Sequence, residues 1–258
     1  MKHARVVYKG RQYDAVEVDD GLQLDDGEYV NEHAVLWLPP VEPRTIFAVG
    51  LNYSDHAAEI DSRAPQKPLI FLKGPDACSG HRTETRRPSG VENMHYECEL
   101  AVVIGREGRA IARARAYDHV AGYTVANDYA VRDYLENYYR PNLRVKSRDA
   151  CTPIGPWLVD AADIADPHNL ALSTHVNGKL TQSGTTRDMI FTIPFLIEYL
   201  SEFMTLSPGD IILTGTPKGV CDCRPGDEVV TEIEGIGQLV NTIVADNEIA
   251  ASSIGDAA

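Results

Sequence analysis

The sequence lacks a hydrophobic run long enough to cross a membrane, and it carries few positive charges. No apolar stretch approaches the ~20 residues that span a bilayer as a helix. Lysine and arginine number 24 against 38 aspartates and glutamates, which gives a formal net charge of −14. An acidic protein of this kind is poorly suited to bind nucleic acid or an anionic membrane. We therefore expect neither as a partner.

Cysteine is also scarce, with five residues scattered through 258 (positions 78, 98, 151, 221 and 223). An odd, scattered set predicts reduced thiols rather than a disulfide framework. The spacing of Cys221-Asp222-Cys223 does not fit a zinc site, and no Cys/His cluster supports one. The polar start of the chain has no signal-peptide pattern. These features predict a cytoplasmic protein.

Regular strand–helix alternation and repeats of fixed period are missing as well. The glycine-rich stretch Thr214-Gly215-Thr216-Pro217 lacks the P-loop pattern, so nucleotide binding is not supported. Such a loop could instead offer backbone N–H groups to a carboxylate or an enolate oxygen. Hydrophobic residues make up 43% of the chain, enough for a sizeable core. Many short strand-like runs with few helices predict a β-rich α+β fold.

Two domains are expected. Residues 1–43 contain four short strand-like runs separated by Gly10, Asp19-Asp20-Gly21 and Asp25-Asp26-Gly27, which favour turns. They predict a small N-terminal β subdomain that ends in a proline-rich linker. Residues 44–258 would form the main domain.

Within the main domain, periodicity and turn residues predict further elements. Buried strands are expected over residues 46–49, 69–72 and 100–104. Further strands are expected over 121–127 and 151–159, and hairpins over 170–182 and 227–244. Helices are expected over residues 113–119, 129–139 and 194–203. Residues 74–90 are expected to form a polar loop over a site. The last helix is expected to face the core with five residues: Phe195, Leu196, Tyr199, Leu200 and Phe203.

Glu97 and Glu99 stand at the mouth of the apolar run that ends in Val102-Val103-Ile104. Residues two apart in a strand lie on one face, roughly 7 Å apart. Two carboxylates this close are unfavourable unless a proton or a cation joins them, and oxygen ligands favour Mg2+, Mn2+ or Ca2+ over zinc. The alternative is a solvated strand end, where charges are common.

Three other groups of charged residues could carry chemistry. On a helix, His56 and Glu59 would share a face, and a carboxylate beside an imidazole suits acid–base work; they could equally be a surface pair. Asp128 could be a third metal ligand or the cap of the helix after it. Five cations in residues 132–148 could bind an anionic substrate or form a solvated face: Arg132, Arg140, Arg144, Lys146 and Arg148.

Taken in order, the motifs resemble those of the fumarylacetoacetate hydrolase superfamily from about residue 44 to residue 244. They are Gly50-Leu51-Asn52-Tyr53 with His56 and Glu59, Phe71-Leu72-Lys73, Glu97-Cys98-Glu99, Asn127-Asp128 with Arg132, Lys146, Gln182 to Thr186, and Thr214-Gly215-Thr216-Pro217. Residues 132–146 are most similar to the branch of bifunctional isomerase/decarboxylases of 4-hydroxyphenylacetate degradation.

The resemblance implies a mixed β-sandwich roll that forms a homodimer or pairs with a paralogous subunit. It implies a Mg2+ site, or one for Mn2+ or Ca2+, made by Glu97, Glu99 and Asp128, and a lid that carries His56 and Glu59. Catalytic roles would fall to His56, Glu59 and Lys146, and substrate contacts to Asn52, Tyr53, Lys73, Arg132, Gln182 and Thr216.

The expected activity is metal-dependent decarboxylation and isomerisation of a 2-oxo-alkenoic di- or tricarboxylate. The substrate would be 5-oxopent-3-ene-1,2,5-tricarboxylate, which would give 2-hydroxyhepta-2,4-diene-1,7-dioate and then its 2-oxo isomer. C–C bond hydrolases of the superfamily add an aspartate ahead of the lid, and this chain has no acid between Glu42 and Asp55. That departure favours decarboxylation over hydrolysis. The alternatives are an acylpyruvate hydrolase, an oxaloacetate decarboxylase and a non-catalytic partner subunit.

Overall fold

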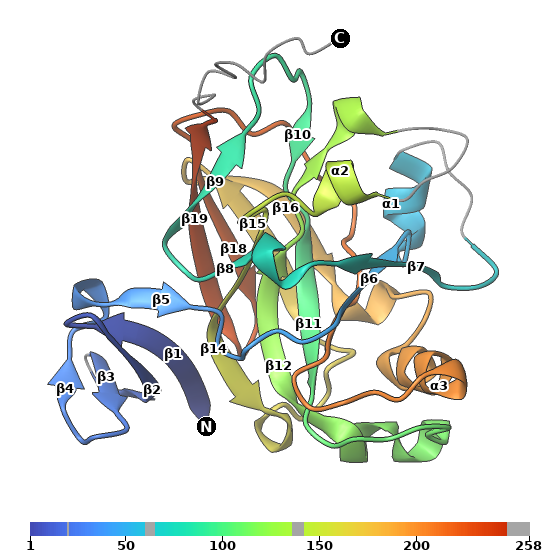
Figure 1. Ribbon diagram of the computed structural model, residues 1–258. Helices are drawn as coiled ribbons and strands as arrows, with labels where there is room; N and C mark the ends of the chain where they lie inside the picture. Colours follow the sequence, from blue (N-terminus) through green and yellow to red (C-terminus); the bar gives the residue numbers. More distant parts are fainter. Residues whose placement is uncertain (20, 60–64, 136–141, 247–258) are drawn as a thin grey trace, which may run out of the picture.

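Two mixed β-sheets packed face to face make up most of the molecule (Figure 1). This computed structural model describes residues 1–19, 21–59, 65–135 and 142–246. The larger sheet has twelve strands, with a main path in the order β4-β3-β2-β1-β14-β12-β11-β17-β6-β7. The second has five, in the order β16-β15-β18-β19-β9. A strand-rich sandwich of this kind confirms the predicted fold class.

The strands of the first half are β1 (Lys2–Tyr8), β2 (Arg11–Val18), β3 (Gly21–Leu24), β4 (Tyr29–Val30), β5 (Leu36–Leu38), β6 (Ile46–Gly50), β7 (Leu69–Lys73), β8 (Cys78–Ser79), β9 (Thr83–Arg87), β10 (Met94–His95) and β11 (Cys98–Ile104). Those of the second half are β12 (Val120–Asn127), β13 (Ala130–Val131), β14 (Thr152–Asp160), β15 (Ala171–Val176), β16 (Lys179–Thr185), β17 (Ile211–Leu213), β18 (Glu228–Ile233) and β19 (Gly237–Ala245).

Helices are short and lie at the margins of the sheets. The α-helices are α1 (Ser54–Glu59), α2 (Leu143–Lys146) and α3 (Ile193–Phe203). The 3-10 turns are η1 (Glu32–Ala34), η2 (Pro75–Ala77), η3 (Arg113–His119), η4 (Arg132–Tyr134), η5 (Ala161–Asp163) and η6 (Thr186–Asp188). None of the helices in the described ranges is long and apolar enough to traverse a bilayer.

Strand β11 runs through the centre of the larger sheet and is buried along its whole length. Leu100, Val102 and Ile104 face the core shared with α3 and the five-stranded sheet. Ala101 and Val103 face a second core on the opposite side. Alternate residues of a strand point to opposite faces, so a strand with apolar residues at successive positions can fill two cores at once. Each buried Val, Leu or Ile contributes roughly 1.5–3 kcal/mol.

The four expected N-terminal strands are present, and they join the larger sheet rather than forming one of their own. Strand β1 pairs antiparallel with β14, at Lys2 with Val159 and His3 with Leu158. Figure 1 shows β1 to β4 projecting to one side of the main body, where β5 adds to β1. The division into domains near residue 43 stays a prediction.

Two expectations about the segment after α1 are wrong. Strand β7 lies at the edge of the sheet, so Leu69 and Leu72 are exposed instead of buried. Residues 74–90 are not a loop, because β8 pairs with β14 and β9 pairs with β19. The inward positions of β9 are Thr85 and Arg87, which satisfy their polar groups by hydrogen bonds. The alternating apolar pattern that identifies strands is therefore missing from β9, because its buried positions are polar.

The helix expected over residues 129–139 is also wrong. Strand β13 pairs with β10 there, and η4 follows it. Tyr129 donates its backbone N–H to the Cys151 carbonyl, so tertiary pairing overrides the local helical preference. Residues 136–141 lie outside the described part of the chain. Asp128 accordingly caps no helix.

Smaller differences affect β16 and α3. Strand β16 continues to Thr185, beyond the expected break at Gln182. Helix α3 buries Ile193, Leu196, Ile197, Leu200 and Ser201, whereas Phe203 is 56% exposed. The helix is thus rotated from the predicted face: the rings of Phe195, Tyr199 and Phe203 pack in sequence along its outer side.

Candidate active site

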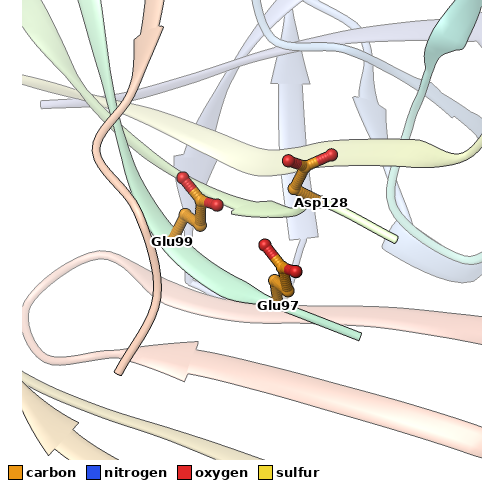
Figure 2. Close-up of side chains that lie close together, drawn as sticks. All are labelled: Glu97, Glu99 and Asp128. Carbon is orange, nitrogen blue, oxygen red and sulfur yellow. The ribbon is translucent and has the colours of Figure 1, made fainter. Parts of the chain in front are cut away.

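Three carboxylates converge where β11 begins and β12 ends. Glu97 precedes β11, Glu99 is its second residue, and Asp128 follows β12. One oxygen of each lies within 4.8 Å of those of the other two, and all three residues are at most 5% exposed. Figure 2 shows the three side chains directed into one space. The solvated-strand-end interpretation of Glu97 and Glu99 is excluded.

The antiparallel pairing of β11 with β12 creates this convergence. Cys98 lies opposite Asn127, which brings the ends that carry Glu97 and Asp128 together. The Asp128 N–H donates to the Glu97 carbonyl at 2.9 Å. The Asn127 side chain accepts the N–H of Glu97 at 2.8 Å and donates to Thr231. The backbone of both metal-ligand candidates is therefore fixed by hydrogen bonds.

Three cations surround the carboxylates. Lys146 Nζ lies 2.6 Å from Glu97 Oε2 and 2.7 Å from Asp128 Oδ2. Lys73 Nζ lies 2.5 Å from Asp128 Oδ1 and also donates to the Lys146 carbonyl. Arg132 Nη2 lies 2.6 Å from Glu97 Oε1. Glu99 has no ion pair in the described part of the chain; its Oε2 accepts the Gly215 N–H at 2.6 Å.

This arrangement splits the acidities of the two glutamates. Burial alone would raise the pKa of Glu97, but the charges of Lys146, Arg132 and His56 hold it at about 2. Burial and the Asp128 charge raise the pKa of Glu99 well above its usual value. Burial would lower the pKa of Lys146, yet Asp128 and Glu97 raise it. Lys146 is thus a permanent cation. Glu99 is the one carboxylate of the three that has no cationic partner among the described residues.

The donor set fits a divalent metal ion. Carboxylate oxygens on rigid backbone suit Mg2+ or Mn2+. Two of the three acids already bind the Lys146 ammonium group, so the space between them accommodates positive charge. A cation beside Glu99 would favour its ionised form and remove the cost of its burial.

Helix α1 places a histidine–glutamate pair close to the carboxylate cluster. The Nδ1 atom of His56 lies 3.0 Å from Glu59 Oε2, and His56 is only 4% exposed. The other oxygen, Glu59 Oε1, accepts the Gly219 N–H at 2.9 Å. A shared cavity is lined by His56, Glu97, Arg132, Lys146 and Thr216. The pair is therefore not a casual surface contact.

Other predicted substrate contacts lie behind the cavity wall. The amide of Asn52 binds the Phe191 backbone and the Thr214 carbonyl. Gln182 donates to Thr216 Oγ1 at 2.9 Å and to the Pro217 carbonyl. These two side chains hold the glycine-rich loop. Tyr53 is fully buried, and its hydroxyl has no hydrogen-bond partner among the described residues.

The basic segment after Asp128 does not form one patch. Arg132 and Lys146 turn to the carboxylates, Arg144 stacks 3.9 Å from the Tyr134 ring, and Arg148 pairs with Asp246. Arg140 lies outside the described residues. The sequence predicted one basic patch rather than this separation, and binding of an anionic substrate by the segment stays a prediction.

Several residues at the site were not predicted. His95 Nδ1 accepts from Arg132 Nε at 3.3 Å, and burial together with Arg132 lowers the pKa of this histidine. The apolar wall of the cavity includes Phe71, Leu135 and Val145. No sequence pattern distinguishes such wall residues from core residues. His95 could have been found from its spacing, because it stands two positions before Glu97 and residues two apart in a strand share a face.

Comparison with known proteins agrees with this geometry. Residues 45–244 match the fumarylacetoacetate (FAA) hydrolase C-terminal family. The chain belongs to this family. It is 59% identical over 221 residues to the 4-hydroxyphenylacetate degradation bifunctional isomerase/decarboxylase of Salmonella dublin, a match that covers 86% of this chain and 51% of that protein. The chain thus spans about half the length of the curated relatives it matches first.

Solved structures of FAA hydrolase family members are also similar. The 5-carboxymethyl-2-hydroxymuconate delta-isomerase from Mycobacterium smegmatis superimposes with a TM-score of 0.85 at 36% identity, over 96% of this chain and 100% of that one. The fumarylpyruvate hydrolase from Pseudomonas aeruginosa, in complex with Mn2+ and pyruvate, superimposes with a TM-score of 0.75 at 33% identity, over 81% of this chain and 92% of that one. The resemblance inferred from the motifs is confirmed.

Proposed function

We propose that the protein is a divalent-metal-dependent decarboxylase/isomerase of 2-oxo-alkenoic di- and tricarboxylates in aromatic catabolism. The observation that carries the proposal is one cavity lined by members of two sets of groups. Glu97 and Lys146 belong to the carboxylate cluster, and His56 belongs to the His56–Glu59 pair. The first set suits charge stabilisation and the second suits proton transfer. The named activities of the Salmonella and Mycobacterium relatives support the same chemistry.

The proposed substrate is 5-oxopent-3-ene-1,2,5-tricarboxylate, whose decarboxylation gives 2-hydroxyhepta-2,4-diene-1,7-dioate. Loss of CO2 leaves an electron pair that delocalises to the 2-oxo oxygen. Isomerisation of the dienol then requires loss of the hydroxyl proton and addition of a proton at carbon. A divalent ion at Glu97, Glu99 and Asp128 would supply Lewis-acid stabilisation of the negative charge on that oxygen.

The chain's own residues divide the remaining work. Glu59 accepts from His56 Nδ1, which leaves Nε2 to exchange a proton with carbon. Lys146, a buried cation, pairs with a substrate carboxylate or the enolate. Arg132 and Thr216 line the cavity and contact the substrate. Lys73, Asn52, Tyr53 and Gln182 shape the site around them.

We further propose Mg2+ as the native metal, with Mn2+ or Ca2+ as substitutes, and a cytoplasmic homodimer or a pair with a paralogous subunit. All five cysteines are free, in keeping with a reducing compartment. The match covers 51% of the Salmonella relative, which leaves room in that protein for a second unit.

A substrate panel tests the proposal. Purified protein is supplied in turn with the tricarboxylate, an acylpyruvate and oxaloacetate, and the products are identified. We expect turnover of the tricarboxylate, and its loss in Glu97→Ala but not in the control Glu92→Ala, whose side chain is exposed. Preference for an acylpyruvate would assign hydrolysis instead, and unchanged turnover in Glu97→Ala would refute catalysis at this site.

A further inference from the structure

A chain of three side chains extends outward from the carboxylate cluster: Glu97, Arg132 and His95. Arg132 Nη2 donates to Glu97 Oε1 at 2.6 Å, and Arg132 Nε donates to His95 Nδ1 at 3.3 Å. Arg132 thus has one fixed partner on each side. The opposite oxygen of Glu97, Oε2, accepts from Lys146 Nζ at 2.6 Å, and the same ammonium group donates to Asp128 Oδ2.

The chemistry of the guanidinium makes the outer contact directional. Every N–H of arginine can only donate, so His95 must present a lone pair on Nδ1. The guanidinium is rigid and planar, so fixing Nε also fixes the direction of Nη2. The acceptor on His95 therefore controls where Arg132 meets Glu97.

The backbone places these side chains but does not orient the guanidinium. Strands β10 and β13 pair at Met94 with Val131 and at His95 with Ala130. The Arg132 N–H donates to the Asn93 carbonyl at 2.9 Å. Arginine keeps its long, flexible side chain beyond that anchor. Among the described residues, the bond that Arg132 Nε donates to His95 Nδ1 is the contact that removes this freedom at Nε.

We propose that His95 is a positioning residue for Glu97: through Arg132 it holds Glu97 Oε1 and so keeps this carboxylate in the cluster with Glu99 and Asp128, in position to bind a divalent cation. This inference rests on the metal site proposed above. Groups that orient metal ligands without touching the metal commonly change its affinity by 10–100-fold. His95 acts through one intermediate residue, so we expect about a tenfold effect.

Three variants of His95 separate orientation from bulk. Asparagine places its side-chain oxygen near the position of Nδ1, glutamine places its amide near Nε2, and leucine has no acceptor. All three leave the charge of Arg132 in place, so a change in affinity reports orientation. Binding of Mn2+ is measured by electron paramagnetic resonance and calorimetry, without substrate. We expect His95→Leu and His95→Gln to raise the Kd about tenfold, and His95→Asn to stay near wild type.

Two controls keep the outcomes distinct. His33→Leu changes an exposed histidine and should leave the Kd unchanged. Glu99→Gln should abolish binding if the carboxylates form the metal site. Wild-type Kd values in all His95 variants, with binding lost in Glu99→Gln, would overturn the positioning role alone. Failure of Glu99→Gln to weaken binding would overturn the metal site. Equal loss in all three His95 variants, with lowered urea stability, would show a structural role only.

Discussion

Replacing Lys146 with methionine should destabilise the metal-free protein and make it depend on a cation. The variant keeps the length of the side chain but leaves Glu97 and Asp128 without the ammonium group that lies 2.6 and 2.7 Å from them. A fall in the pKa of Glu97 from 4.5 to about 2 corresponds to about 3 kcal/mol of stabilisation, to which Lys146 contributes most among the charges, ahead of Arg132 and His56. That value lies at the lower end of the roughly 3–5 kcal/mol that breaking a buried ion pair costs.

The pH range of this effect follows from its sign. A carboxyl whose pKa is lower in the folded state stabilises the fold above pH 4.5, and this contribution is lost as the pH falls from 4.5 towards 2. We therefore expect the full difference at pH 7.5, where roughly 3 kcal/mol lowers the Tm by about 6–12 °C. Added Mn2+ should raise the Tm of Lys146→Met more than that of wild type, because the cation replaces the missing charge.

Calorimetry in EDTA and in excess Mn2+ measures both effects. Lys179→Met, at an exposed lysine of β16, is the matched control and should behave as wild type. Catalysis should stay lost in Lys146→Met even with Mn2+ bound. Equal Tm values of Lys146→Met and wild type in EDTA, or an equal gain from Mn2+, would show that the Lys146 ammonium group does not stabilise the carboxylate cluster.

Two further predictions concern other residues. Burial and the Arg82 charge lower the pKa of His81 from 6.5 to about 3, so its contribution to stability is full above pH 6.5 and declines below it. Between pH 7.5 and pH 5, the free energy of unfolding measured in urea should fall by about 2 kcal/mol because of this group. The fall should be absent in His81→Asn, which keeps an acceptor for the Val240 N–H. An equal fall in the variant would contradict the assignment to His81. Glu59→Gln should slow isomerisation by about 100-fold while Mn2+ affinity stays unchanged, because Glu59 orients His56 and binds no metal. Steady-state ultraviolet assays measure the rate, and wild-type kcat would exclude proton transfer by this pair.

Patterns that depend on burial were predictable from the sequence. The run of Leu100 to Ile104 is apolar at successive positions because both faces of β11 are covered, and the acids at its mouth followed from strand spacing. The hairpins at Asn177-Gly178 and Gly235 formed as expected because their turns need the positive φ that these residues tolerate. Asp128 was a candidate third ligand from its place at the end of a strand-like run, and it lies with Glu97 and Glu99 in the structure, while its role as a ligand stays a prediction.

Features that depend on long-range pairing were not predictable. Strand β9 satisfies Arg87 with acceptors on Cys223 and Asp222, more than 130 positions away, so its own sequence resembles a loop. Residues 129–131 pair with β10 rather than forming a helix. The contacts of Arg132 with both His95 and Glu97 depend on the folded arrangement of these residues, so no sequence pattern indicated them.

On the function proposed above, the three carboxylates bind a metal that the reaction requires. The most direct test supplies purified protein with 5-oxopent-3-ene-1,2,5-tricarboxylate, traps CO2 and follows the ultraviolet absorbance, in EDTA and after addition of Mg2+. We predict CO2 release and loss of the enone and dienol absorbance with Mg2+, and neither in EDTA. Turnover that persists unchanged in EDTA, or no CO2 and no dienol conversion with Mg2+, would contradict the claim.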